Sequence, residues 1–242
     1  MQGRMLVFLG VNMKIKNPFS DLSCFEFVLW LSSVIITLIS YIISGTGDVL
    51  TVIASLIGVT ALIFVAKGYV LGQVLTVVFA VFYGIISFFF KYYGEMITYL
   101  FMTAPIAMMS VISWIRHPYK GTKEVEVNSL TKKQIIWGGI FSILTTVIFY
   151  FVLSAIGNKN ILFSTISITT SFLACYLTFL RSPYYAIAYA ANDIVLIVLW
   201  VLASFSDIKY IGVVVCFIAF FANDIYGFIN WKRMEERQNE KS

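Results

Sequence analysis

Long runs of apolar residues, each followed by a short polar segment, dominate the pattern along the chain. The hydrocarbon core of a bilayer is about 30 Å thick, and a helix of about 20 apolar residues spans it. Eight runs of about this length occur, at residues 26–44, 49–66, 69–90, 96–115, 135–156, 160–180, 184–205 and 209–231. The pattern therefore predicts an all-α integral membrane protein with eight transmembrane helices.

The composition of the 242-residue chain agrees with this pattern and excludes several soluble classes. Hydrophobic residues make up 60% of the chain and charged residues only 12%, whereas about 25% of a soluble domain is charged. The mean hydropathy is +0.90. The net charge of +5 comes from basic residues in short loops, which is not the footprint of a nucleic-acid-binding surface. A soluble enzyme, a nucleic-acid partner and a disordered chain are therefore excluded.

Residue types that build common catalytic and metal sites are scarce. His117 is the single histidine, and Cys24, Cys175 and Cys216 are isolated from one another. The sequence has no metal-ligand spacing, no phosphate-binding loop and no serine-nucleophile elbow. We therefore expect no catalytic residue, no metal, no cofactor and no enzyme activity.

The distribution of Lys and Arg predicts the orientation in the membrane. With eight spans, both termini and the second, fourth and sixth loops share one side. Fourteen of the 17 Lys and Arg residues lie on that side, and only Lys91, Lys159 and Lys209 lie on the other. Because basic loops stay in the cytoplasm, both termini of this multi-pass protein are expected to be cytoplasmic.

Two similar segments indicate an internal repeat. The fourth span ends in Ser113-Trp114-Ile115-Arg116, and the eighth ends in Asn230-Trp231-Lys232-Arg233. Each segment closes a group of three helices, and the single helix between the groups gives both the same orientation. This is the parallel 3+1+3 repeat of SWEET-like transporters, in which the substrate site lies between the repeats. Both tryptophans are expected in the aromatic belt at the membrane interface.

The repeat divides the chain into five parts. We expect an N-terminal arm with an extra helix (1–48), a first three-helix repeat (49–115), a cytoplasmic loop with a linker helix (116–156), a second three-helix repeat (157–231) and a charged C-terminal tail (232–242).

Charged side chains inside a span are costly and therefore point to function. Asp193 in the seventh span and Asp224 in the eighth are such residues, and each follows an asparagine. Rings and amides accompany them at helical spacing. We expect a binding site for a small polar ligand with a flat heterocycle, formed by Tyr185, Tyr189, Asn192, Asp193, Asn223, Asp224 and Tyr226, with Tyr99 and Thr103 of the fourth span as weaker candidates.

Other interpretations of these polar residues stay open. Asn and Asp also bond one membrane helix to another without binding a ligand. Two aspartates on neighbouring helices could imitate an intramembrane aspartyl enzyme, but the usual motif neighbours are absent. A structural membrane protein or a sensor is a further alternative.

Several motifs resemble those of the bacterial Pnu-type vitamin transporters over about residues 49–235. The resemblance is carried by Phe82-Tyr83-Gly84-Ile85-Ile86, Tyr93-Gly94-Glu95-Met96, Trp114-Ile115-Arg116, Asn192 and Asn223-Asp224-Ile225-Tyr226-Gly227. It implies a full-length relative of SWEET proteins in the inner membrane of a bacterium, assembled as a homotrimer. It also implies facilitated diffusion of a nucleoside-like vitamin, which a cytosolic kinase then phosphorylates and traps. The first span would be an extra N-terminal helix.

The resemblance implies nicotinamide riboside as the substrate. This chain differs from the carriers of that riboside at the positions whose rings would stack on it. The carriers of this riboside typically place a Trp-x-x-Trp pair before the asparagine that Asn192 matches, but this chain has Tyr185 and Ala188 there, and Tyr189 adds a ring one residue later. An expected polar residue of the fourth span falls near Leu100.

The choice of substrate also depends on charge. Asp193 or Asp224 would complement the positive pyridinium ring of nicotinamide riboside, and the tyrosines would add ring stacking. A deoxynucleoside or thiamine is the alternative substrate, because members of the family also resemble carriers of those molecules.

Overall fold

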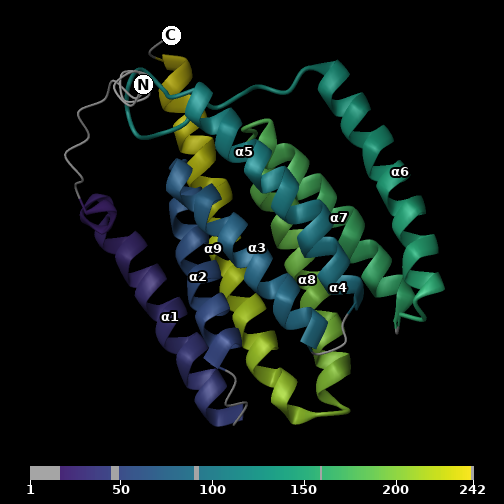
Figure 1. Ribbon diagram of the computed structural model, residues 1–242. Helices are drawn as coiled ribbons and strands as arrows, with labels where there is room; N and C mark the ends of the chain where they lie inside the picture. Colours follow the sequence, from purple (N-terminus) through teal and green to yellow (C-terminus); the bar gives the residue numbers. More distant parts are fainter. Residues whose placement is uncertain (1–16, 45–48, 90–92, 159, 241–242) are drawn as a thin grey trace, which may run out of the picture.

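The computed structural model describes residues 17–44, 49–89, 93–158 and 160–240, so residues 1–16 of the expected N-terminal arm lie outside the described residues. Eight described segments are long and apolar enough to cross a membrane, and they lie where the apolar runs predict them (Figure 1). The helices are α1 (Cys24–Ser44), α2 (Val49–Ala66), α3 (Val70–Phe89), α4 (Tyr93–Thr98), α5 (Ala104–Arg116), α6 (Lys132–Ala155), α7 (Ile161–Phe179), α8 (Tyr185–Ser204) and α9 (Ile211–Glu240).

The fourth span is a single helix that a π-helical turn, Tyr99–Thr103, divides into α4 and α5. Pro105 lies two residues after the end of this turn. Proline has no backbone N–H to donate, and its ring crowds the preceding turn of a helix. A π turn relieves such crowding by widening the helix, and π turns are frequent at functional sites.

Six of the eight spans form a closed ring. In the first triplet (α2, α3 and α4–α5), α2 packs on α3 and α3 packs on α5; in the second triplet (α7, α8 and α9), α7 packs on α8 and α8 packs on α9. The ring closes at two seams, where α2 meets α9 and α5 meets α7. Outside the ring, α1 packs on α2 and α9, and α6 packs on α7 (Figure 1).

A tryptophan crosses each seam to the opposite triplet. Trp114 Nε1 of α5 donates to the carbonyl oxygen of Thr178 in α7 at 3.0 Å, and Trp231 Nε1 of α9 donates to that of Val65 in α2 at 2.9 Å. The two side chains are 1% and 0% exposed, and their ring centroids lie 5.4 Å apart. The expectation that these tryptophans form an interfacial belt is therefore wrong, because both are buried between the triplets.

The residue before each tryptophan adds a second matching bond. Ser113 Oγ donates to the carbonyl oxygen of Phe179 at 3.1 Å, and Asn230 Nδ2 donates to that of Ala66 at 2.8 Å. The last carbonyls of a helix have no partner within the helix. Each triplet thus donates to carbonyls at the end of the other triplet's first helix, and those of Phe179 and Ala66 receive a side-chain partner there.

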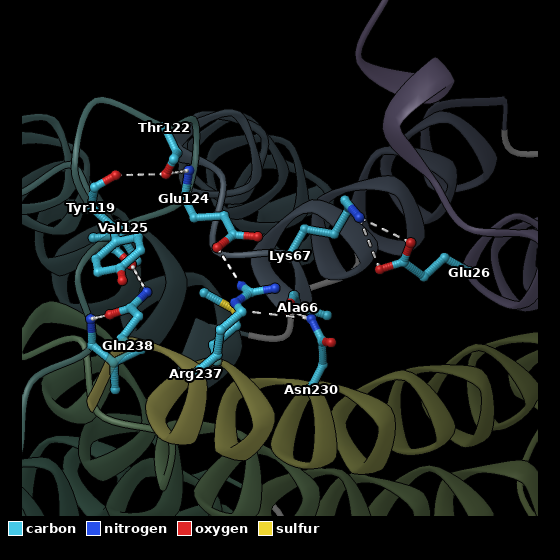
Figure 2. Close-up of polar contacts among 12 residues, drawn as sticks. Glu26, Ala66, Lys67, Tyr119, Thr122, Glu124, Val125, Asn230, Arg237 and Gln238 are labelled. Carbon is cyan, nitrogen blue, oxygen red and sulfur yellow. Dashed lines mark hydrogen bonds and ion pairs between the residues drawn. The ribbon is translucent and has the colours of Figure 1, made fainter. Parts of the chain in front are cut away.

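The loop 117–131, called the strap below, crosses this end of the ring (Figure 2). Val125 of the strap is 1% exposed, and its backbone N–H donates to the carbonyl of Gly68 at 2.9 Å. Gln238 of α9 accepts from the N–H of Val127 at 2.8 Å and donates to the carbonyl of Val125 at 3.1 Å. The strap is therefore joined both to the α2–α3 turn and to α9.

The last helix is longer than the apolar run predicts. Helix α9 continues to Glu240, so the described part of the expected charged tail, 232–240, is helical. Trp231, Met234 and Gln238 are buried along one side of this extension. Their spacing of i, i+3 and i+7 forms one stripe of a helix, which faces the strap and extends the helix beyond the apolar span.

Candidate functional site

A cavity of about 70 Å³ lies inside the ring, and all six ring spans contribute to its wall. Its polar lining consists of Gln73, Thr76, Tyr99, Thr103, Ser171, Tyr189, Asn192, Asp193 and Asp224. Its apolar lining consists of Gly58, Ala61, Leu62, Val65, Phe79, Phe217 and Phe220. Ionisable side chains within a membrane bundle face its interior or a cavity and mark paths for a substrate or an ion, because lipid offers them no partner.

Two buried carboxyl groups dominate the electrostatics of this cavity. Asp193 of α8 and Asp224 of α9 are each 4% exposed, and their side chains form a hydrogen bond with each other. Asp193 Oδ2 is buried without a hydrogen-bond partner in the described part of the chain. Among the described residues that line the cavity, none is Lys, Arg or His. The cavity therefore presents two carboxyl groups among its polar side chains, with no basic side chain among its described lining residues.

The amide of Asn192 is held in place by helix α7. Its Oδ1 accepts from Ser167 Oγ at 3.0 Å and from Thr170 Oγ1 at 2.9 Å. An amide oxygen has two lone pairs, so these two bonds use its acceptor capacity. The NH₂ group of Asn192 is left as the donor that the side chain can offer to a ligand.

Two tyrosines bring aromatic rings to the cavity wall. Tyr99 lies in the π turn, and its ring centroid is 4.5 Å from that of Tyr83. Tyr189 lies on α8, and its hydroxyl is 3.3 Å from the sulfur of Cys175. Thr103, also in the π turn, lines the cavity with them. These rings come from opposite triplets and can contact a flat ligand.

Three of the expected site residues do not line the cavity. Tyr185 is 1% exposed and packs on Trp231, with ring centroids 4.9 Å apart. Asn223 Nδ2 donates to Ser33 Oγ of α1 at 3.0 Å. The hydroxyl of Tyr226 donates to Glu26 Oε1 of α1 at 2.8 Å.

The periodicity of α9 explains why Asn223 and Tyr226 turn away. Phe217, Phe220 and Asp224 follow one another at i, i+3 and i+7 and share the stripe that faces the cavity. Asn223 and Tyr226 fall on the neighbouring stripe, which faces α1. There Glu26 also forms an ion pair with Lys67 at 3.0 Å (Figure 2). These side chains therefore attach the extra helix to the ring.

Sequence reasoning missed part of the cavity wall. Gln73 and Thr76 form an i, i+3 pair on α3, and the amide of Gln73 in an apolar span was a usable signal. Ser171 and the phenylalanines at 79, 217 and 220 also line the cavity. Nothing in the sequence distinguishes these phenylalanines from those that face lipid.

A larger hollow of about 530 Å³ lies at the opposite end of the molecule from the strap. The turns between α6 and α7 and between α8 and α9 line it, together with Glu95 and Asp207. It is not enclosed by the ring and does not include the two bonded aspartates. The ring cavity is therefore the better candidate for a binding site within the membrane.

Comparison with known proteins gives consistent matches. A family model described as nicotinamide mononucleotide transporter matches residues 48–233. The nicotinamide riboside transporter PnuC of Neisseria mucosa is 24% identical over 192 residues, which cover 77% of this chain and 73% of that protein. The nicotinamide riboside transporter PnuC of Haemophilus influenzae is 22% identical over 214 residues, which cover 88% of this chain and 92% of that protein.

A solved structure has the same fold. The crystal structure of the vitamin B3 transporter PnuC matches with a TM-score of 0.77 at 23% sequence identity, over 90% of this chain and 94% of that chain. The resemblance to Pnu-type transporters is thus confirmed, and this is a family of membrane transporters, not of enzymes. Because the family model matches most of the chain, the protein belongs to the nicotinamide mononucleotide transporter family.

Proposed function

We propose that this protein carries nicotinamide riboside across the inner membrane of a bacterium. Both relatives described above are named for this substrate. A polar cavity walled by both triplets supports the proposal, because carriers built from repeats bind their substrate between the repeats near the middle of the bilayer.

The charge of the cavity wall carries the choice of substrate. Asp193 and Asp224 line the cavity, and none of its described lining residues is basic. A phosphate group needs cationic or multiple N–H donors, so this wall disfavours the phosphorylated mononucleotide after which the family is described. A riboside has no phosphate, and its hydroxyls and carboxamide suit the amides of Asn192 and Gln73. The dephosphorylated nucleoside is therefore the substrate that the lining supports.

A deoxynucleoside is the second candidate. It is supported by Ala188, which stands where nicotinamide riboside carriers typically place a tryptophan, and by Tyr185, which packs on Trp231 outside the cavity. Tyr99 and Tyr189 provide the rings at the cavity, and they would also stack on a neutral base. Ring stacking therefore does not distinguish the two substrates. They differ in charge, because nicotinamide riboside is a cation and a deoxynucleoside is neutral.

Transport proceeds by alternating access in this proposal. The cavity of about 70 Å³ is smaller than the ~300–1,000 Å³ of typical ligand sites, so the triplets must separate to admit a nucleoside. Residues 49–115 and 157–231 would rock as parallel repeats, with 116–156 as the connection and 1–48 as the extra helix. The matched tryptophan bonds at the two seams support the repeat, because they relate the triplets by the same exchange of contacts.

The driving force in this proposal is the substrate gradient alone. No phosphate-binding loop is present in the sequence, so movement would be facilitated diffusion, followed by trapping through a cytosolic kinase. The carrier would assemble as a homotrimer with both termini in the cytoplasm, an orientation supported by the excess of Lys and Arg on that side.

Uptake by proteoliposomes tests the proposed substrate. Purified protein should take up radiolabelled nicotinamide riboside to equilibrium without accumulation, and excess unlabelled riboside should compete. Nicotinamide mononucleotide, thymidine and thiamine should compete weakly, and protein-free liposomes provide the control. Absence of riboside uptake, or stronger competition by thymidine or by the mononucleotide, would overturn the proposed substrate.

A further inference from the structure

Asp193 and Asp224 lie on neighbouring helices of the second triplet and are bonded to each other inside the cavity. A hydrogen bond between two carboxyl groups requires a proton on one of them. The bonded pair therefore holds one negative charge at most. Two separate carboxylates at this contact would repel each other, which is why such pairs share a proton.

The surroundings of the pair provide no positive charge. The titratable side chains that interact with it are Tyr99, Tyr185, Tyr189 and Cys216, all of which are neutral when protonated. In the described part of the chain, no ion pair includes either aspartate. An ionised carboxylate buried without a partner costs several kcal/mol. A ligand with a single positive charge would remove this cost, whereas a neutral ligand would not.

We propose that Asp193 and Asp224 act as one proton-sharing unit that can carry a single negative charge, and that this charge, formed when a cationic ligand binds and a proton leaves the pair, selects the cationic form of the nicotinamide ring over its uncharged reduced form. This inference rests on the proposed function and deepens it, because it assigns the charge of the substrate as the property that the cavity recognises. The pyridinium ring of nicotinamide riboside carries one positive charge, and the 1,4-dihydro ring has nearly the same shape without that charge. Tyr99 and Tyr189 strengthen the preference, because aromatic faces attract cations.

The single-unit arrangement has a distinctive mutational signature. In Asp193→Asn or Asp224→Asn, the amide N–H donates to the remaining carboxylate in place of the shared proton. The cavity then still holds one negative charge. In the double variant no carboxylate remains, and both amides are neutral. Single substitutions should therefore preserve the selectivity, and the double substitution should abolish it.

The experiment measures inhibition of labelled nicotinamide riboside uptake into proteoliposomes by two competitors, unlabelled nicotinamide riboside and its 1,4-dihydro form. In the unmodified protein the cationic competitor should be at least tenfold more potent. Each single variant should keep this ratio within about threefold, and the double variant should reduce it to about one. Asp207→Asn provides the matched control, because it makes the same acid-to-amide change at the hollow outside the ring and should leave the ratio unchanged.

Three results would overturn the inference. The first is equal potency of the two competitors in the unmodified protein, a comparison that requires no variant to fold. The second is loss of selectivity in one single variant alone, which would make that aspartate an ordinary counter-ion. The third is retained selectivity in a double variant that elutes as a single species on gel filtration. Failure of the proposed function differs from all three, because the unmodified protein would then take up no riboside.

Discussion

Trp114 of the first triplet reaches a carbonyl at the end of α7, and Trp231 of the second triplet reaches a carbonyl at the end of α2. The triplets thus exchange the same contact at both seams. At the cavity they differ, since both carboxyl groups and Asn192 come from the second triplet, whereas the first contributes Gln73 and the residues of the π turn. The matched tryptophan contacts hold the two triplets together. The side chains that could bind a substrate are those in which the triplets differ.

A second difference lies where each triplet turns. Gly68 and Arg181 both adopt a left-handed backbone, with φ of 69° and 59°. Four residues later the first triplet has Gly72, where α3 lies against α2, and the second has Tyr185, which packs on Trp231. At this position of the first triplet, the backbones of α2 and α3 are in direct contact. At the matching position of the second triplet, a large side chain fills the space.

The largest effect is expected at Gly72. An added Cβ would lie 2.3 Å from the backbone N of Val65 and 2.7 Å from the carbonyl carbon of Phe64. Backbone atoms cannot move aside without parting the helices, so Gly72→Ala should cost more than about 3 kcal/mol. The yield of monodisperse protein after detergent extraction should fall to near zero. Gly139→Ala, where an added Cβ meets nothing within 4 Å, should leave the yield unchanged; equal yields of the two variants would contradict the close approach.

The next effect concerns the unequal chemistry of the cavity. Asn192→Leu removes an amide donor from the cavity wall and leaves Ser167 Oγ without its acceptor, whereas Thr170 Oγ1 keeps the carbonyls of Ile166 and Ser167. A lost hydrogen bond of about 1.5 kcal/mol corresponds to roughly tenfold weaker riboside uptake. Gln73→Leu in the first triplet should reduce uptake by about threefold or less. A greater loss at Gln73 than at Asn192 would reverse the assigned roles of the two triplets.

The seams should respond equally to matched substitutions. Trp114→Phe and Trp231→Phe each remove one N–H donor from a carbonyl that keeps a backbone partner, the N–H of Arg181 at Thr178 and the N–H of Gly68 at Val65. Each should cost about 1–3 kcal/mol and lower the thermal unfolding temperature in detergent by a similar number of degrees. Each substitution also replaces a buried indole by a smaller ring, so the loss of packing is of the same kind at both seams. If one substitution lowered the unfolding temperature strongly and the other did not, the two seams would not be equivalent.

The smallest effect is expected where α9 extends beyond its seam. Gln238→Ala removes the two hydrogen bonds from Gln238 to the strap and leaves the ion pair between Arg237 and Glu124, with a net cost of about 1–2 kcal/mol. Backbone amides of the strap, Val127 above all, should exchange hydrogen for deuterium faster. The exposed Glu236 offers the control Glu236→Gln, for which exchange should not change. Unchanged exchange in Gln238→Ala would mean that the strap is held without Gln238.

Sequence reasoning located the spans well, because a run of about 20 apolar residues has few alternatives to a membrane helix. It did not locate the seams. A tryptophan at the end of a span is typical of the membrane interface, and the burial of Trp114 and Trp231 depends on contacts between segments far apart in the chain. The extension of α9 to Glu240 could not be predicted for the same reason, since Gln238 near its end bonds to the strap, which lies far away in the sequence.

The candidate site was predictable in part. Charge inside a span identified Asp193 and Asp224, and both line the cavity. Helical spacing grouped Asn223 and Tyr226 with Asp224, but it could not tell which stripe of α9 faces the cavity. In a soluble helix the apolar stripe indicates the core, whereas in a membrane helix lipid and neighbouring helices are both apolar. A polar residue in a membrane helix therefore predicts a polar contact but not which element makes it. For Asn223 and Tyr226 that element is α1.

An experimental structure of the purified protein with nicotinamide riboside tests the central claim most directly. We expect ligand density inside the ring, with the pyridinium ring against the bonded pair of Asp193 and Asp224 and near Tyr99 and Tyr189. Density confined to the hollow beside Glu95 and Asp207, or to the outer surface of the bundle, would contradict the assignment of the ring cavity as the substrate site.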